Sequence, residues 1–357
     1  MDDLNLLKAL CETFGPSGAE DPVKDKILDE LGGIAERVRE DRVGNLILAL
    51  PGRDRSRKIM VSAHMDEVGF MVSGIEDGYL KFQTVGGIDP RVLCGRRVRI
   101  LHDGRYVEGV TGSKAVHHQT REERGTATKV RDMYIDVGQF EEGEDIPAAI
   151  GDYGTFVSEF VRFGENDRFI KAKAIDDRLG CAILIELARE LSGTELPYDL
   201  YICFTRCEEI GYSGATVAAA SIQPDVAVVL ESTAVGDLAG TDDSARVAEA
   251  GQGGVLSLVD RSTIYDEDLI RFALQTGKEH GIPVQVKKWV SGGNDAGHIH
   301  KTGRGVRCLA LSAPARYLHS PSTVICAQDY FSMRELLKHF LLEIKIPDAA
   351  SGTRGNV

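Results

Sequence analysis

The chain has 357 residues, enough for one large domain and a smaller second one. Hydrophobic residues make up 43% of it and charged residues 27%, a composition typical of a soluble globular protein. The 42 basic and 55 acidic residues give a net charge of −13. This balance argues against nucleic acid as a partner, because phosphates bind to basic surfaces, and it gives no reason to expect a membrane partner.

The N-terminal ten residues are acidic and amphipathic, and they lack the basic start and apolar run of a signal peptide. No stretch approaches a membrane-spanning length. The seven cysteines are scattered and odd in number, which favours free thiols in a reducing cytoplasm over a disulfide framework. Cys203 is better explained as a strand residue, and Cys207 as a residue just past that strand. A metal site is disfavoured because the sequence has no second cysteine pair.

In chain order, the pattern first predicts a helix over 2–14 that stops at Gly15 and Pro16. Ser17 and Glu20 have the spacing of a capping box ahead of a second helix over 23–31. Three strands are then expected, near 37–42, 46–50 and 58–63.

The sequence changes character over 67–163. Short runs at 79–82, 97–101 and 133–137 are interrupted by glycines, and helical periodicity is nearly absent. This pattern predicts a small all-β module.

Strands and helices alternate again in the rest of the chain. We expect helices over 176–192, 213–221, 266–280 and 327–344, and strands over 198–205, 225–231, 254–260, 283–290 and 306–313. The alternation predicts an α/β fold with a helix-covered, mostly parallel sheet. Residues 1–66 and 164–346 would form this domain, 67–163 the inserted β module, and 347–357 a disordered tail.

Five side chains that bind metals lie where these core segments end or begin. Ligands bind outside the carboxyl ends of the strands in open α/β sheets, so we expect the five to meet there. Two histidines and three carboxylates at one place predict a two-metal hydrolytic site. The five residues are His64, Asp176, Glu209, Glu231 and His319.

Two neighbours of these ligands have further chemistry. Asp66 lies two residues after His64 at a strand end, where a carboxylate can orient a metal-binding imidazole. Glu208 and Glu209 would repel each other unless a cation or a proton lies between them. One glutamate of this pair is suited to bind metal and the other to accept a proton from water.

Other candidate groups are weaker. The glycine loop 292–297 allows close approach to a ligand. His298 and His300 fall on a helix start, where a structural role is favoured. His117 and His118 lie in the β module and have no assigned role.

These motifs, in this order, resemble the tetrahedral aminopeptidase family, which includes glutamyl and deblocking aminopeptidases and proteins once labelled cellulase M or FrvX-like. The resemblance spans about residues 1–345. The motifs that carry it are SAHMDEVGF at 62–70, AIDDR at 174–178, CEEIG at 207–211, ESTAVGD at 231–237, GGNDAG at 292–297 and RYLHSP at 316–321.

The resemblance implies a phosphorylase/hydrolase-like catalytic domain with two metals, zinc or cobalt. Asp176 would bridge both ions, His64 and Glu231 would complete one site, and Glu209 and His319 the other. It further implies Glu208 as general base, Asp66 as support for His64, and substrate contacts at Gly293 and Asp295. The inserted β-barrel would be a dimerisation domain of a homo-oligomer, often a tetrahedral dodecamer.

Three features depart from the family pattern. Glu231 stands where many members have aspartate, Asn294 where a threonine is expected, and the stretch 112–118 lacks the usual proline. Glu231 would affect the metal preference, and Asn294 would affect the substrate loop. The changed stretch 112–118 would affect the oligomer.

The sequence thus predicts a cytoplasmic aminopeptidase that hydrolyses short peptides through a metal-bridging water. A related two-metal amide hydrolase, such as an N-acyl deacylase or deblocking enzyme, would use the same chemistry. A non-catalytic assembly protein is disfavoured because Glu208 and all five ligands are present. A glycosidase is disfavoured because that reaction needs two carboxylates across a sugar cleft.

Overall fold

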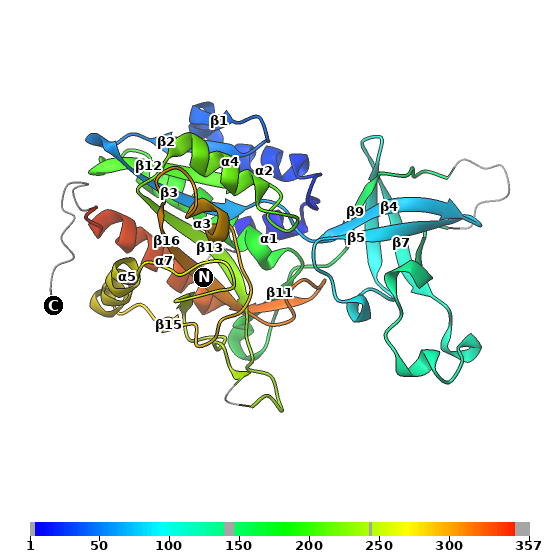
Figure 1. Cartoon of the computed structure of the whole chain (residues 1–357). Helices are drawn as coiled ribbons and strands as arrows, with labels where there is room; N and C mark the ends of the chain where they lie inside the picture. The colour runs from blue at the N-terminus through cyan, green and yellow to red at the C-terminus, as the bar shows by residue number, and fades with distance from the viewer. Residues whose placement is uncertain (1–3, 139–145, 243–244, 347–357) are drawn as a thin grey trace.

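The computed structural model describes residues 4–138, 146–242 and 245–346. They form an α/β body and a β-barrel that projects from one side of it (Figure 1). This arrangement confirms the fold class predicted from the sequence. The predicted tail over 347–357 lies outside the described residues.

An eight-stranded sheet runs through the body in the order β1-β2-β12-β3-β13-β16-β14-β15. Its four central strands, β12, β3, β13 and β16, are parallel, and antiparallel pairings occur toward both edges. The central strands are rich in buried Val, Ile, Leu and Ala because both faces of the sheet are covered. The strands are β1 (Val38–Glu40), β2 (Leu46–Leu50), β3 (Asp54–His64), β12 (Tyr198–Thr205), β13 (Val226–Ala234), β14 (Gly254–Leu256), β15 (Val284–Val286) and β16 (Arg307–Ala315).

Two groups of helices pack on this sheet. The long helix α3 contacts β3 and β13 and is itself contacted by α1, α2 and α7, while α5 packs on α7. The second group, α4 and α6, contact each other and the strands β12, β13 and β16. The helices are α1 (Asn5–Glu12), α2 (Asp21–Leu31), α3 (Ile175–Leu191), α4 (Ser213–Ile222), α5 (Glu267–His280), α6 (Ala296–Ile299) and α7 (Ala327–Glu343).

The inserted module is a closed barrel with its own hydrophobic core. Phe70 packs edge-on against Phe82 and Phe156, with ring centroids 5.6 and 5.3 Å apart. Such a core lets the module fold around its own apolar contacts. Its strands are β4 (Gly69–Glu76), β5 (Tyr79–Val85), β6 (Arg97–His102), β7 (Arg105–Ser113), β8 (Met133–Asp136) and β9 (Tyr153–Phe156).

A third sheet has three strands, in the order β10-β11-β17. Its strands are β10 (Val161–Phe163), β11 (Phe169–Ala172) and β17 (Thr323–Cys326). Although β10 falls within the 67–163 segment, it pairs with β11 and not with a barrel strand. The last barrel strand in the chain ends at Phe156.

Two predicted strands are shorter than expected. The strand expected over 254–260 ends at Leu256, because the chain then turns around Asp260, whose carboxylate accepts hydrogen bonds from the backbone of Ser262 and Thr263. The strand expected over 283–290 covers only 284–286, at the edge of the sheet, where a partner strand is present on one side only.

The capping box predicted from Ser17 and Glu20 is wrong. Ser17 Oγ donates to Asp66 Oδ2 at 2.5 Å, and Glu20 accepts from Arg206 Nε at 2.9 Å. Glu20 also occupies the N-cap position of α2 without a side-chain cap. Both side chains therefore fix the loops around the site described next.

Candidate active site

The five predicted ligands come together at the carboxyl edge of the parallel strands. His64 ends β3 and Glu231 lies in β13, beside it in the sheet. Glu209 follows β12, His319 follows β16, and Asp176 lies at the start of α3. Because four adjacent parallel strands end at this edge, side chains far apart in sequence become neighbours.

The ligand atoms form two triads that share Asp176. His64 Nε2 lies 3.3 Å from Asp176 Oδ1 and 3.9 Å from Glu231 Oε2. His319 Nε2 lies 3.4 Å from Asp176 Oδ2 and 3.2 Å from Glu209 Oε1. Within each triad the ligand atoms lie within 4.8 Å of one another. Asp176 thus directs one carboxylate oxygen toward each triad.

The backbone around Asp176 departs from helical geometry. Ala174 is left-handed, with φ of 53°, and Asp176 itself has φ of −80° and ψ of 109°. The peptide bond between Asp176 and Asp177 is cis. The non-helical φ and ψ angles of Ala174 and Asp176 turn the Asp176 side chain toward the strand ends.

Asp66 holds the glutamate pair in place. Its Oδ1 accepts from the backbone N–H of Glu208 at 3.0 Å, and its Oδ2 from that of Glu209 at 3.1 Å. His64 Nδ1 lies 3.0 Å from the backbone oxygen of Asp66 and 3.5 Å from its Oδ1. The nearer partner of the imidazole is thus a carbonyl, and the Asp66 carboxylate mainly orients Glu208 and Glu209.

The second histidine is oriented by the barrel. His319 Nδ1 lies 2.8 Å from the carbonyl oxygen of Gly87, which leaves Nε2 directed at Asp176 and Glu209. Gly87 lies between β5 and β6, in the inserted module. Since the free ring nitrogen of a metal-binding histidine is usually fixed by such a bond, the module supplies part of the site.

The carboxylates lie in an environment with too little positive charge. Burial raises the pKa of Glu209 to about 7, and burial followed by the neighbouring Glu208 raises the pKa of Glu231 well above its usual range. Burial would lower the pKa of His319, but its bond to Asp176 and the charge of Glu209 raise it to about 9. Additional positive charge near these carboxylates would therefore stabilise their ionised forms.

Two buried oxygens support the same conclusion. Among the described residues, Glu231 Oε1 makes no hydrogen bond, and Glu209 Oε1 makes none besides its 3.2 Å ion pair with His319 Nε2. An unpaired buried carboxylate oxygen is costly, and a divalent cation is the partner that satisfies several at once. The two histidines and three carboxylates therefore fit divalent metal ions.

A cavity of about 480 Å³ opens beside the triads. Glu208, Glu209, Glu231, His319 and Gly293 line it, as expected for the site. Glu208 also lines the cavity, and it belongs to neither triad.

The other expected substrate residue, Asp295, lies differently. It is 1% exposed and is not among the residues that line the cavity. Its Oδ2 accepts from Thr205 Oγ1 at 2.8 Å, at the end of β12. In this structure Asp295 supports the strand end below the site.

The weaker histidine candidates lie apart from the triads. His298 stacks on the ring of Tyr212, with centroids 4.8 Å apart, and His300 Nδ1 lies 2.8 Å from the carbonyl of Ala296. His117 and His118 are exposed on a short helix of the barrel segment. Cys203 and Cys207 are free thiols, the first of them buried in β12.

Sequence reasoning missed three residues that shape the site. Ser17 bonds Asp66, Tyr212 lines the cavity, and Lys287 places a cation in it. A lysine just past an edge strand carries no signal of its own, because the direction of its side chain depends on the following loop. Lys287 is 9% exposed, and its backbone N–H donates to the carbonyl of Leu256 in β14 at 2.8 Å.

A parallel α/β sheet with two carboxylate-bridged His/acid triads at its carboxyl edge defines a divalent-metal hydrolase. A family model described as M42 glutamyl aminopeptidase matches residues 44–336. The chain therefore belongs to the M42 family, and it is an aminopeptidase. The resemblance and the activity expected from the sequence are both confirmed.

Relatives of known name match over nearly their whole length. A putative aminopeptidase of Acetivibrio thermocellus is 34% identical, over 94% of this chain and 97% of its own. Lysyl aminopeptidase of Pyrococcus furiosus is 33% identical, over 98% of this chain and 99% of its own. Glutamyl aminopeptidase of Lactococcus lactis is 30% identical, also over 98% and 99%.

Solved structures of aminopeptidases have the same fold as this chain. The TET aminopeptidase of Thaumarchaeota archaeon SCGC AB-539-E09 superposes with a TM-score of 0.91, at 34% identity over 96% of each chain. The TET1 peptidase of Pyrococcus horikoshii, described as assembling into a tetrahedron or a large octahedral shell, has a TM-score of 0.83 at 30% identity, over 96% of this chain and 99% of its own.

Within the described residues, no helix is both long and apolar enough to cross a membrane.

Proposed function

We propose that the two triads bind two divalent cations, zinc or cobalt, and that the enzyme removes single residues from the free N-terminus of short peptides. The observation that carries the proposal is the position of Asp176, which directs one oxygen to each triad. When bound, divalent cations polarise a carbonyl group and make water more acidic. Comparing a peptide with its N-acetylated form tests the need for a free N-terminus, and faster cleavage of the acetylated peptide would favour a deblocking enzyme.

Glu208 is suited to move the proton in this reaction. Its carboxylate lines the cavity beside both triads, and Asp66 fixes its backbone through the 3.0 Å bond to its N–H. In the proposed mechanism Glu208 accepts a proton from the attacking water and delivers it to the leaving amine.

The cavity itself supports a preference for an acidic first residue. Lys287 lines it, is 9% exposed, and donates through Nζ to the carbonyl of Ser291 at 2.7 Å. Burial lowers the pKa of Lys287, so a carboxylate partner would stabilise its charge. Asp260, also at the cavity, is already bonded by Ser262 and Thr263. Lys287, together with Arg261 at the same cavity, is therefore available to an acidic side chain of the substrate.

We expect Lys287→Gln to lower kcat/KM on glutamyl-p-nitroanilide by about 10- to 100-fold, since a charge-assisted hydrogen bond contributes about 1.5–3 kcal/mol. Turnover of leucyl-p-nitroanilide should change by less than about threefold. Lys288→Gln is the matched control, because Lys288 is adjacent but exposed. A wild-type enzyme that prefers lysyl substrates would refute this specificity.

We also propose that the barrel mediates self-association in a reducing, cytoplasmic compartment. The seven cysteines are free, and three apolar side chains on the barrel segment are strongly exposed: Val110, Val116 and Ile150 at 46, 54 and 69%. An apolar patch to which these side chains contribute would be suited to an interface between subunits, because contiguous exposed apolar surface marks such sites. The P. horikoshii relative, described as assembling into a tetrahedron or a large octahedral shell, and the PhTET1-12s structure, described as a dodecamer, support a dodecamer as the expected end state.

Light scattering at micromolar concentration should therefore give a mass well above that of a dimer. Ile150→Glu should reduce that mass without unfolding the catalytic domain, because the side chain is exposed and Glu is costly only in an interface. Ile264→Glu serves as control, since Ile264 is 82% exposed on the body. A monomeric wild type would contradict the proposal.

A further inference from the structure

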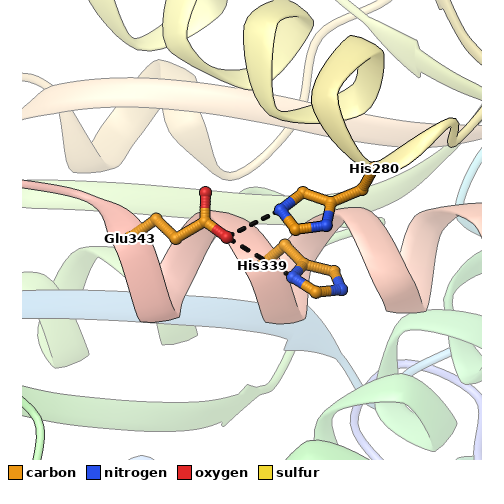
Figure 2. Close-up of side chains that lie close together, drawn as sticks. All are labelled: His280, His339 and Glu343. Atoms are coloured by element: carbon orange, nitrogen blue, oxygen red, sulfur yellow. Dashed lines mark hydrogen bonds and ion pairs between the residues drawn. The ribbon is translucent and has the colours of Figure 1, made fainter.

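Three more side chains with metal-ligand chemistry meet where α5 packs against α7 (Figure 2). His280 is the last residue of α5, and His339 and Glu343 lie one turn apart on α7. None of the three lines the catalytic cavity. Figure 2 shows both imidazole rings directed at the same carboxylate.

Their separations are close to those of ligands around one ion. Glu343 Oε1 lies 2.7 Å from His280 Nε2 and 3.5 Å from His339 Nδ1, and the three ligand atoms all lie within 4.8 Å. Tetrahedral ligands at the zinc bond length of ~2.0–2.1 Å lie roughly 3.3–3.5 Å apart. Turning the two imidazole rings out of their present stack would therefore place the three atoms around a cation.

The helices hold these side chains in position. Phe272 of α5 and Phe340 of α7 pack edge-on with ring centroids 5.4 Å apart, which fixes the two helices against each other. The rings of His280 and His339 are stacked, with centroids 3.6 Å apart and planes at 22°. His339 and Glu343 share a helix face because they are four residues apart.

We propose that His280, His339 and Glu343 bind one divalent cation of the zinc type, with water in the fourth position, and that this ion joins the C-terminal ends of α5 and α7. Two imidazoles and one carboxylate suit zinc, cobalt or nickel, whereas magnesium and calcium need oxygen ligands. The side chains are 28–36% exposed, so the ion can enter without unfolding. This site is independent of the catalytic metals.

The test counts bound zinc in the full-length enzyme after metal removal and reloading. Calorimetric titration and elemental analysis at tens of micromolar zinc measure the number of zinc ions bound per chain. This number should be larger by one in wild type than in His339→Ala or Glu343→Gln. His117→Ala, an exposed histidine of the barrel segment, is the control and should match wild type. Magnesium should not replace zinc at this site in any of the four proteins.

Two further readouts keep the test decisive. Reloaded variants should retain wild-type kcat/KM, because the three residues lie outside the catalytic cavity. The zinc-dependent rise in Tm should be smaller in His339→Ala and Glu343→Gln than in wild type and His117→Ala. Equal zinc content and equal Tm shifts in all four proteins would show that the three residues form only an ion-paired cluster.

Discussion

Glu208→Gln should lower kcat by about 10²–10⁴-fold while leaving the metal content unchanged. Glutamine has the shape of glutamate but cannot accept the proton of the attacking water, and loss of a general base costs about this much. Glu208 belongs to neither triad, so its substitution should not release the ions. Steady-state kinetics on an aminoacyl-p-nitroanilide, with elemental analysis of the same samples, measure both effects.

The control for this variant is Glu279→Gln, a glutamate exposed on α5. It makes the same chemical change far from the cavity and should retain wild-type turnover. A Glu208→Gln enzyme with near-normal kcat would contradict the role assigned to Glu208. Loss of metal in that variant would instead show that Glu208 supports the ligands.

Asp176→Asn should have the second large effect, because this residue is the ligand common to both triads. An amide is a much weaker ligand than a carboxylate, so the variant should lose metal from both sites and lose nearly all turnover. Glu231→Gln, which alters only the His64 triad, should release fewer ions than Asp176→Asn. Elemental analysis after dialysis at low metal concentration compares the three proteins.

An Asp176→Asn enzyme that retains both ions would refute the shared-ligand arrangement. Circular dichroism of the metal-free variant separates metal loss from unfolding. The fold should survive, because asparagine fits the same space and most of the other residues of α3 are buried in the core.

Much of this site could be predicted from the sequence for one physical reason. Parallel strands place their carboxyl ends at one edge, so acids and histidines that end apolar runs, such as His64 and Glu231, must approach each other. The helices were predictable because apolar periodicity and end signals agreed, as in α5, where Asp266 caps the start and Gly281 ends the helix.

What the sequence did not predict depends on contacts between distant segments. Ser17 and Glu20 have the spacing of a helix cap, but Asp66 and Arg206 are stronger partners that only the folded chain brings near them. Asp295 belongs to a glycine loop suited to contact substrate, yet its carboxylate accepts a hydrogen bond from Thr205 and does not line the cavity. Local patterns cannot show such competition.

Glu67 lies at the junction between the barrel and the body, and it is 2% exposed. Its Oε1 accepts from Lys173 Nζ at 2.5 Å and lies 3.5 Å from a guanidinium nitrogen of Arg178, both of the body. Its Oε2 accepts from Thr155 of the barrel at 2.8 Å.

This buried junction limits how the chain can be divided or recombined. An excised catalytic body would leave Lys173 without its carboxylate partner and His319 without the Gly87 carbonyl that orients it. A chimera that exchanges the barrel must therefore carry over Glu67, Thr155 and the 86–88 loop with it. For the same reason the barrel and the body should be exchanged together in evolution. A barrel taken from another protein would need to restore the contacts to Lys173 and His319 before the site could work.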